Sequence, residues 1–218
     1  ETILNQSSNV GISLATEKAG FQYLNEIISR LKILEKTGVD YPGEVAGIME
    51  DFSSWAKVTG YNISFGQGIT ASPLQMVRAY GAICNDGVLT TPHFLLSKPQ
   101  TGTWEEYESE KVIDDMEALA KLKSMMRGVV SSGTGKNANI DGYKVVGKTS
   151  TAEIAENGTY AENRYNLCFT GFIDESNSNL VCFVSANDVV YEGNVSGIFS
   201  DIMSEAIEQY NIVPKASQ

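Results

Sequence analysis

Lysine, serine and threonine side chains that could bind a carboxylate or an oxyanion are concentrated in one short stretch, Val145-Val146-Gly147-Lys148-Thr149-Ser150-Thr151-Ala152. Its β-branched residues predict a strand. Side chains alternate on a strand, so Lys148 and Ser150 would share one face, with Thr149 and Thr151 on the other. An ammonium beside hydroxyls and strand N–H groups is a good receptor for an anion. The structural alternative is an edge strand whose lysine discourages aggregation.

Other short motifs occur in a fixed order around this stretch. Ser7-Ser8-Asn9 lies near the start and is followed by Val10-Gly11. Residues 65–76 read F-G-Q-G-I-T-A-S-P-L-Q-M, and Asn85-Asp86-Gly87 and Gly133-Thr134-Gly135 follow before the lysine stretch. Together these motifs resemble the class B penicillin-binding proteins, whose hallmarks include S-x-x-K, S-x-N and K-T-G-T-A. The resemblance covers nearly the whole chain.

The resemblance implies a serine acyltransferase that cross-links peptidoglycan by acyl transfer from D-Ala-D-Ala stem peptides and that β-lactams acylate. It implies that Ser7 relays a proton to the leaving nitrogen, that Asn9 holds the substrate amide, and that Lys148 sets the electric field around them. Thr149 and Thr151 would bind the substrate's terminal carboxylate, and the Thr151 N–H would supply half of an oxyanion hole.

Ser150 stands where the family usually has glycine. Its hydroxymethyl group would narrow the substrate groove. Because Lys148 and both threonines are in place, we expect this departure to affect affinity more than identity.

The attacking serine of an S-x-x-K motif is not found where the family places it. Two such strings begin at Ser29 and Ser54, but both follow Ser7-Ser8-Asn9, whereas the family motif precedes it. The first lies on the polar face of an amphipathic segment, and we interpret both as chance occurrences. We therefore expect residues 1–218 to be the C-terminal portion of one transpeptidase domain, inactive alone. Its nucleophilic serine and base lysine would lie in a missing N-terminal portion.

Two alternatives stay open. A D,D-carboxypeptidase or β-lactamase of the same fold would use water in place of the amine, although residues 65–76 argue against it. A non-catalytic penicillin-sensing module would fit the absent nucleophile. We expect no cofactor or metal. By the resemblance, the whole protein would be anchored in the bacterial cell membrane by a segment outside this sequence, with this domain on the extracytoplasmic face, where the division or elongation machinery would be its partner.

Composition limits the class of partner. With 16 Lys and Arg against 27 Asp and Glu, the net charge of −11 excludes duplex nucleic acid as a partner, because phosphate neutralisation needs clustered cations. The three cysteines have no metal-ligand spacing, and a Ser-His-Asp triad would rest on His93, the single histidine. Ser132-Gly133-Thr134-Gly135-Lys136 fails the phosphate-loop pattern because Asn137 follows the lysine.

Apolar residues at helical spacing predict helices over residues 1–36, 73–84, 114–129 and 196–210, with Ser72 as the N-cap of the second. Strands are predicted over 90–97, 145–153, 165–173 and 180–186, with a hairpin or loop over 102–113, a loop-rich segment over 44–71 and a polar turn at 156–159. Three consecutive strands before a final helix predict an α+β fold, an antiparallel sheet covered by helices. The resemblance implies the serine β-lactamase and penicillin-binding transpeptidase type, incomplete at its N-terminus.

Overall fold

The computed structural model describes residues 1–156, 159–190 and 193–215. The chain forms two compact units, one of residues 1–8 with 120–218 and one of residues 9–119. The first is built on an antiparallel sheet, and the second combines helices with short strand pairs. This mixture of helices and antiparallel strands confirms the predicted α+β class.

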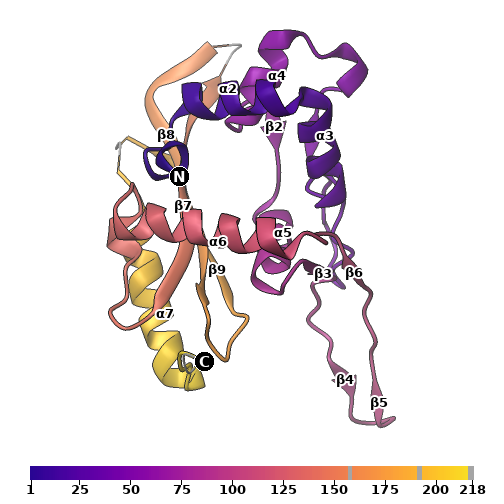
Figure 1. Cartoon of the computed structure of the whole chain (residues 1–218). Helices are drawn as coiled ribbons and strands as arrows, with labels where there is room; N and C mark the ends of the chain where they lie inside the picture. The colour runs from indigo at the N-terminus through magenta and orange to yellow at the C-terminus, as the bar shows by residue number, and fades with distance from the viewer. Residues whose placement is uncertain (157–158, 191–192, 216–218) are drawn as a thin grey trace. The chain divides into compact units, whose positions relative to one another are not determined.

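The sheet of the first unit contains β7 (Lys144–Glu156), β8 (Thr159–Asp174) and β9 (Val181–Val189) in the order β7-β8-β9, with antiparallel neighbours (Figure 1). All three predicted strands are confirmed, and each extends a few residues further than predicted. Within the described residues, β7 pairs only with β8 and is therefore an edge strand. The predicted turn at 156–159 includes residues 157 and 158, which lie outside the described residues.

Helix α7 (Ser196–Tyr210) was correctly predicted and packs on β8 and β9 (Figure 1). The rings of Phe169 and Phe199 are both fully buried, with centroids 4.7 Å apart. Burial of apolar surface is the main stabilising term of such a core. The core cluster comprises Val130, Ala138, Val145, Leu167, Phe169, Ile173, Val184, Val195, Phe199, Met203 and Ile212.

Two glycines face each other across β7 and β8 and make room for the Phe169 ring. Gly147 pairs with Gly171 in the strand register. A Cβ atom on Gly147 would lie 2.4 Å from Phe169 Cζ, and one on Gly171 would lie 3.0 Å from Phe169 Cε1. The strand that carries Lys148 is therefore fixed by close packing immediately before the lysine.

Helix α6 (Met116–Ser131) is fastened to the end of β8 by charged side chains. Asp174 is nearly buried and lies 3.4 Å from Lys123 Nζ and 2.5 Å from Arg127 Nη2. Arg127 also reaches Glu175 at 2.7 Å. A buried carboxylate requires such partners, because an isolated charge is costly away from water.

The prediction that residues 1–36 are helical is correct in type but wrong in its end, because the last helix stops at Arg30. Three helices occupy the segment, α1 (Thr2–Asn5), α2 (Asn9–Ala19) and α3 (Phe21–Arg30). The breaks fall at Ser7 and Gly20, whose φ angles of 51° and 99° lie outside the helical region.

The second unit also contains a helix in the segment predicted as loop-rich. Its elements after α3 are β1 (Ile48–Met49), η1 (Phe52–Ser54), α4 (Lys57–Ser64), β2 (Ile69–Thr70), α5 (Pro73–Cys84), β3 (Val88–Thr90), β4 (Ser97–Lys98), β5 (Thr103–Trp104) and β6 (Ser109–Lys111). The predicted N-cap of α5 is confirmed as a capping box, in which Gln75 N–H donates to Ser72 Oγ at 3.2 Å and Ser72 N–H donates to Gln75 Oε1 at 2.7 Å.

The predicted strand over residues 90–97 is wrong, because only its two ends are strands. The Asp40 carboxylate accepts the N–H groups of Phe94 at 2.7 Å and Leu95 at 2.8 Å, so these donors are satisfied without a strand partner. The hairpin or loop predicted over 102–113 does not form a hairpin of its own: its strands β5 and β6 pair with β4 and β3, so this segment is the returning half of a longer antiparallel arm. Strands β4 and β5 lie at the far end of this arm (Figure 1).

Candidate active site

Ser7 is carried by a tight turn directly after α1. Its φ of 51° lies in the left-handed region, which is uncommon for a residue other than glycine or asparagine. The turn is closed by two backbone bonds, from Ser7 N–H to the Leu4 carbonyl at 3.1 Å and from Ser8 N–H to the Ile3 carbonyl at 2.9 Å. The Ser7 hydroxyl therefore stands on a well-defined backbone.

Helix α1 lies against two glycines. A larger residue at either position would force Asn5 or the neighbouring backbone to shift. A Cβ atom on Gly128 would lie 2.7 Å from Asn5 Oδ1, and one on Gly133 would lie 2.5 Å from the Asn5 carbonyl oxygen. That carbonyl accepts a hydrogen bond from Thr134 N–H at 3.0 Å. The Ser7 turn is thus held close to the loop that follows α6.

Lys148 and Ser7, which are 141 positions apart in the sequence, meet in this unit. Lys148 Nζ donates to Ser7 Oγ at 2.8 Å and to the Thr149 carbonyl at 3.0 Å. A third acceptor, Thr149 Oγ1, lies 3.4 Å away. The three donors of an ammonium group are matched by these three acceptors.

Burial makes the Lys148 ammonium easier to deprotonate than a lysine in water. Burial lowers the pKa of Lys148, while the negative form of the nearby Cys168 thiol would act in the opposite direction. The same burial raises the pKa of Cys168. A partly desolvated ammonium interacts more strongly with its neighbours than one in water. Lys148 therefore combines a fixed position with an enhanced local field.

The predicted hydroxyl residues of β7 occupy different environments. Thr149 is 8% exposed, and its Oγ1 lies 2.7 Å from Thr134 Oγ1, whereas Ser150 and Thr151 are exposed. Ser150 pairs with Cys168 across the strands, and a hydrogen bond from Ser150 favours the thiolate of that cysteine. The structure thus brings Ser7, Lys148 and Thr149 into contact, and Ser150 and Thr151 follow them along the same strand.

Asn9 is the first residue of α2 and belongs to the other compact unit, so its role stays a prediction. Thr134 and Asn5 are contacts of the site that sequence reasoning missed. The Gly133-Thr134-Gly135 motif was a signal for Thr134, but nothing in the sequence pointed to Asn5.

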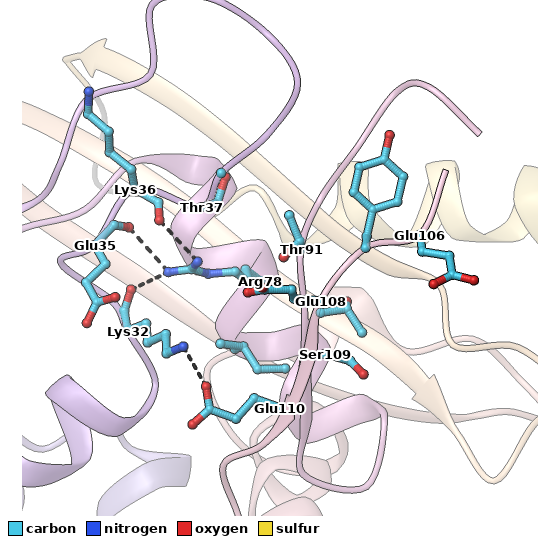
Figure 2. Close-up of a pocket in the computed structure, with 14 residues that line it drawn as sticks. Lys32, Glu35, Lys36, Thr37, Arg78, Thr91, Glu106, Glu108, Ser109 and Glu110 are labelled. Atoms are coloured by element: carbon cyan, nitrogen blue, oxygen red, sulfur yellow. Dashed lines mark hydrogen bonds and ion pairs between the residues drawn. The ribbon is translucent and has the colours of Figure 1, made fainter. Parts of the chain in front are cut away.

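Both S-x-x-K lysines in the second unit are engaged in ion pairs. Lys32 Nζ lies 2.5 Å from Glu110 Oε2 (Figure 2), and Lys57 Nζ lies 2.5 Å from Glu17 Oε1. Hydrogen bonding to these carboxylates raises the pKa of each lysine. A lysine that must accept a serine proton needs the opposite shift, which supports the interpretation of both strings as chance.

A pocket of about 650 Å³ lies beside Lys32 in the same unit. The buried side chain of Arg78 lines this pocket and has a structural role. Figure 2 shows Arg78 donating to backbone carbonyls of the turn after α3. The distances are 2.5 Å to the Lys32 oxygen and 3.3 Å to the oxygens of Glu35 and Lys36. His93, the single histidine, stacks on Tyr107 with ring centroids 3.7 Å apart, and its Nδ1 lies 3.1 Å from the Thr91 carbonyl oxygen.

Comparisons with known proteins agree with this geometry. The family model of the penicillin-binding protein transpeptidase domain matches residues 1–204. Stage V sporulation protein D of Bacillus subtilis is 29% identical over 227 residues, which cover 99% of this chain and 35% of that protein. The protein named "Probable peptidoglycan D,D-transpeptidase PenA" of Neisseria meningitidis serogroup B is 29% identical over 217 residues, covering 97% of this chain and 36% of that protein.

A crystal structure of penicillin binding protein 3 from Mycobacterium tuberculosis, complexed with aztreonam, matches with a TM-score of 0.88 and 26% identity. The match covers 99% of this chain and 52% of that one. The chain spans about a third of the length of the curated relatives it matches. With a family model that matches nearly its full length, this chain belongs to the penicillin-binding protein transpeptidase domain family.

Proposed function

We propose that this chain is the C-terminal portion of the transpeptidase domain of a serine-type D,D-transpeptidase, which cross-links peptidoglycan by acyl transfer from D-Ala-D-Ala stem peptides and is acylated by β-lactams. The contact of 2.8 Å between Lys148 Nζ and Ser7 Oγ carries the proposal, because it joins two family motifs into one hydrogen-bonded pair. The names of the relatives, a D,D-transpeptidase and a penicillin-binding protein bound to aztreonam, support the reaction class.

In this proposal Ser7 passes a proton to the leaving nitrogen of the substrate. Lys148 donates to the Ser7 oxygen, so the single hydroxyl hydrogen of Ser7 remains available for donation elsewhere. As Ser7 gives up this proton, the base lysine returns to it the proton removed from the attacking serine. The Lys148 charge stabilises negative charge on Ser7 Oγ during the exchange. Asn9 would hold the substrate amide.

The free edge of β7 would bind the substrate. Lys148 Nζ reaches the Thr149 carbonyl at 3.0 Å, so that carbonyl faces the free edge of the strand. Backbone groups of residues two apart face the same way in an antiparallel strand, which places the Thr151 N–H on that edge too. This N–H would supply half of the oxyanion hole, and Thr149 and Thr151 would bind the terminal carboxylate. Ser150 would narrow the groove beside them.

The attacking serine and base lysine would come from sequence outside these 218 residues. Lys32 and Lys57 support this, because each is paired with a carboxylate that keeps it protonated. No helix in the described parts of the chain is long and apolar enough to cross a membrane. We propose that another segment of the protein anchors it, with this domain on the extracytoplasmic face. Division or elongation proteins would be its partners there.

The test is to label the full-length protein with a fluorescent penicillin and to map the adduct by peptide mass spectrometry. We expect the label on an S-x-x-K serine outside residues 1–218, and a Ser7→Ala variant that labels at least tenfold more slowly. The 218-residue chain alone should form no adduct. A label on Ser29, Ser54 or any other serine of this chain would overturn the assignment.

Stem-peptide substrates then separate the alternatives. Release of D-Ala into water without cross-linked product would identify a D,D-carboxypeptidase. Acylation by penicillin without any turnover of stem peptide would identify a penicillin-sensing module. Cross-linked dimer is the product that the proposed function predicts.

A further inference from the structure

Thr134 lies in the loop between α6 and η2 (Lys136–Ala138) and makes two contacts that the roles given above leave unexplained. Its N–H donates to the carbonyl of Asn5 at 3.0 Å. Its hydroxyl lies 2.7 Å from the hydroxyl of Thr149. One residue therefore binds both the turn that carries Ser7 and the strand that carries Lys148.

These contacts close a ring around the reacting groups. From Asn5 the backbone leads in two residues to Ser7, and from Thr149 the ring continues to Lys148 Nζ through the contacts of 3.0 and 3.4 Å. The bond of 2.8 Å between Lys148 and Ser7 completes it. Cooperative hydrogen-bond networks of this kind are more rigid than isolated pairs.

The Thr149 hydroxyl oxygen contacts both the Lys148 ammonium group and the Thr134 hydroxyl. Lys148 can only donate, so Thr149 Oγ1 accepts from it. The Thr149 oxygen has a second lone pair, so the bond of 2.7 Å between the two hydroxyls can run in either direction, and either way it fixes the position of the Thr149 oxygen. Because Thr149 is 8% exposed, removal of the Thr134 hydroxyl would leave the Thr149 hydroxyl without this partner and with little access to water. The hydroxyl would turn to find another partner, and its oxygen would move away from Lys148.

We propose that Thr134 is a positioning residue, which keeps the Lys148 ammonium directed at Ser7 by fixing the Thr149 hydroxyl. This inference rests on the proposed function, since the pair it positions is the proton relay. Thr134 acts through Thr149 and does not touch the reacting atoms.

The test compares Thr134→Val, which keeps the N–H and the shape but lacks the hydroxyl, with Thr134→Ser, which keeps the hydroxyl. Penicillin acylation of the full-length protein is measured across pH. We expect the valine variant to acylate about three- to tenfold more slowly, as the loss of one ordinary hydrogen bond implies. The alkaline limb of its pH profile should move to lower pH, because Lys148 loses an acceptor that favours its charged form. The serine variant should behave as the unsubstituted protein does.

Thr103→Val is the matched control, because the hydroxyls of Thr101 and Thr103 also form a pair, at 2.6 Å, but this pair is exposed and lies in the arm of the second unit, away from Lys148 in the sequence. It should change neither rate nor profile. If the valine variant melts without cooperativity, Thr134→Ala, which adds no bulk, replaces it.

If Thr134→Val has the same acylation rate and the same alkaline limb as the unsubstituted protein, the positioning role of Thr134 is overturned, and the proposed function is not affected. A slow rate that Thr134→Ser shares, with an unmoved limb, would overturn that role too, because such a result describes a general structural role. Failure of the unsubstituted protein to label would instead overturn the proposed function.

Discussion

Replacing Gly147 by alanine tests how tightly the strand before Lys148 is held. The added Cβ would lie 2.4 Å from Phe169 Cζ and 2.9 Å from the Thr170 carbonyl oxygen. Carbon atoms in contact need about 3.5–4.0 Å, so the ring would have to withdraw by roughly 1 Å or more. Phe169 is fully buried against Phe199, which leaves it no free space. Overpacking of this kind costs about 1–3 kcal/mol.

Part of this cost is offset in the unfolded state. Alanine has fewer unfolded conformations than glycine, which returns about 0.4–1 kcal/mol. The midpoints of the two ranges give a net loss of stability of about 1.3 kcal/mol, or roughly 3–5 °C in melting temperature for a domain of this size. Because residue 147 directly precedes Lys148, a shift of the strand at this position should also slow penicillin acylation.

The assay is thermal melting of the full-length protein followed by circular dichroism. Gly81→Ala is the matched control, since its Cβ would meet no atom within 4 Å and Gly81 lies inside α5. Alanine in place of glycine in a helix interior stabilises by up to about 1 kcal/mol. A Gly147→Ala variant that melts at or above the temperature of the unsubstituted protein would refute the packing argument.

The remaining predictions concern the decoy serines and two residues of the site. Ser29→Ala and Ser54→Ala should each leave penicillin acylation within about twofold, and a tenfold loss in a stopped-flow assay would contradict their assignment as chance motifs. Lys148→Met should not lower the melting temperature at neutral pH, because burial holds the pKa of Lys148 below its unfolded value and the charged form is penalised. The penalty is relieved as pH rises through the depressed pKa toward the unfolded value of about 10.4, so any advantage of methionine should shrink over that window, and a growing advantage would contradict the sign. Ser150→Gly should speed acylation by bulky β-lactams more than by small ones, at a cost of about 0.5–1 kcal/mol in stability, whereas equal gains for both would dismiss crowding.

Local chemistry explains which parts of the fold could be predicted. The strands around Lys148 are rich in β-branched and aromatic residues, and Ser72 with Pro73 specifies the start of α5 through bonds within four residues. The α4 sequence Lys57–Ser64 contains glycine and β-branched residues, which are weak helix formers. This helix packs on α2, and Gly60 allows the Phe21 ring to approach within contact distance. Such long-range packing has no local signature, so α4 was missed.

The candidate site divides in the same way. Ser7 and Lys148 were recognised by motif, and the structure brings them into contact. Thr134 was visible only as part of a glycine-rich run, because its value depends on Asn5 and Thr149, which are distant in the sequence. The strand prediction for residues 90–97 failed for a related reason. The Asp40 carboxylate accepts hydrogen bonds from backbone N–H groups that a strand partner would otherwise have accepted.

A double-mutant cycle on Ser7 and Lys148 tests the central claim most directly, that the two act as one hydrogen-bonded relay in acyl transfer. The acylation rate of the full-length protein by penicillin is measured for Ser7→Ala, Lys148→Met and the double variant. Each single substitution should slow acylation at least tenfold, and the double variant should be little slower than the slower single variant, because residues that act as a unit are strongly non-additive. Rate losses that multiply, or a single variant with the unsubstituted rate, would contradict the account.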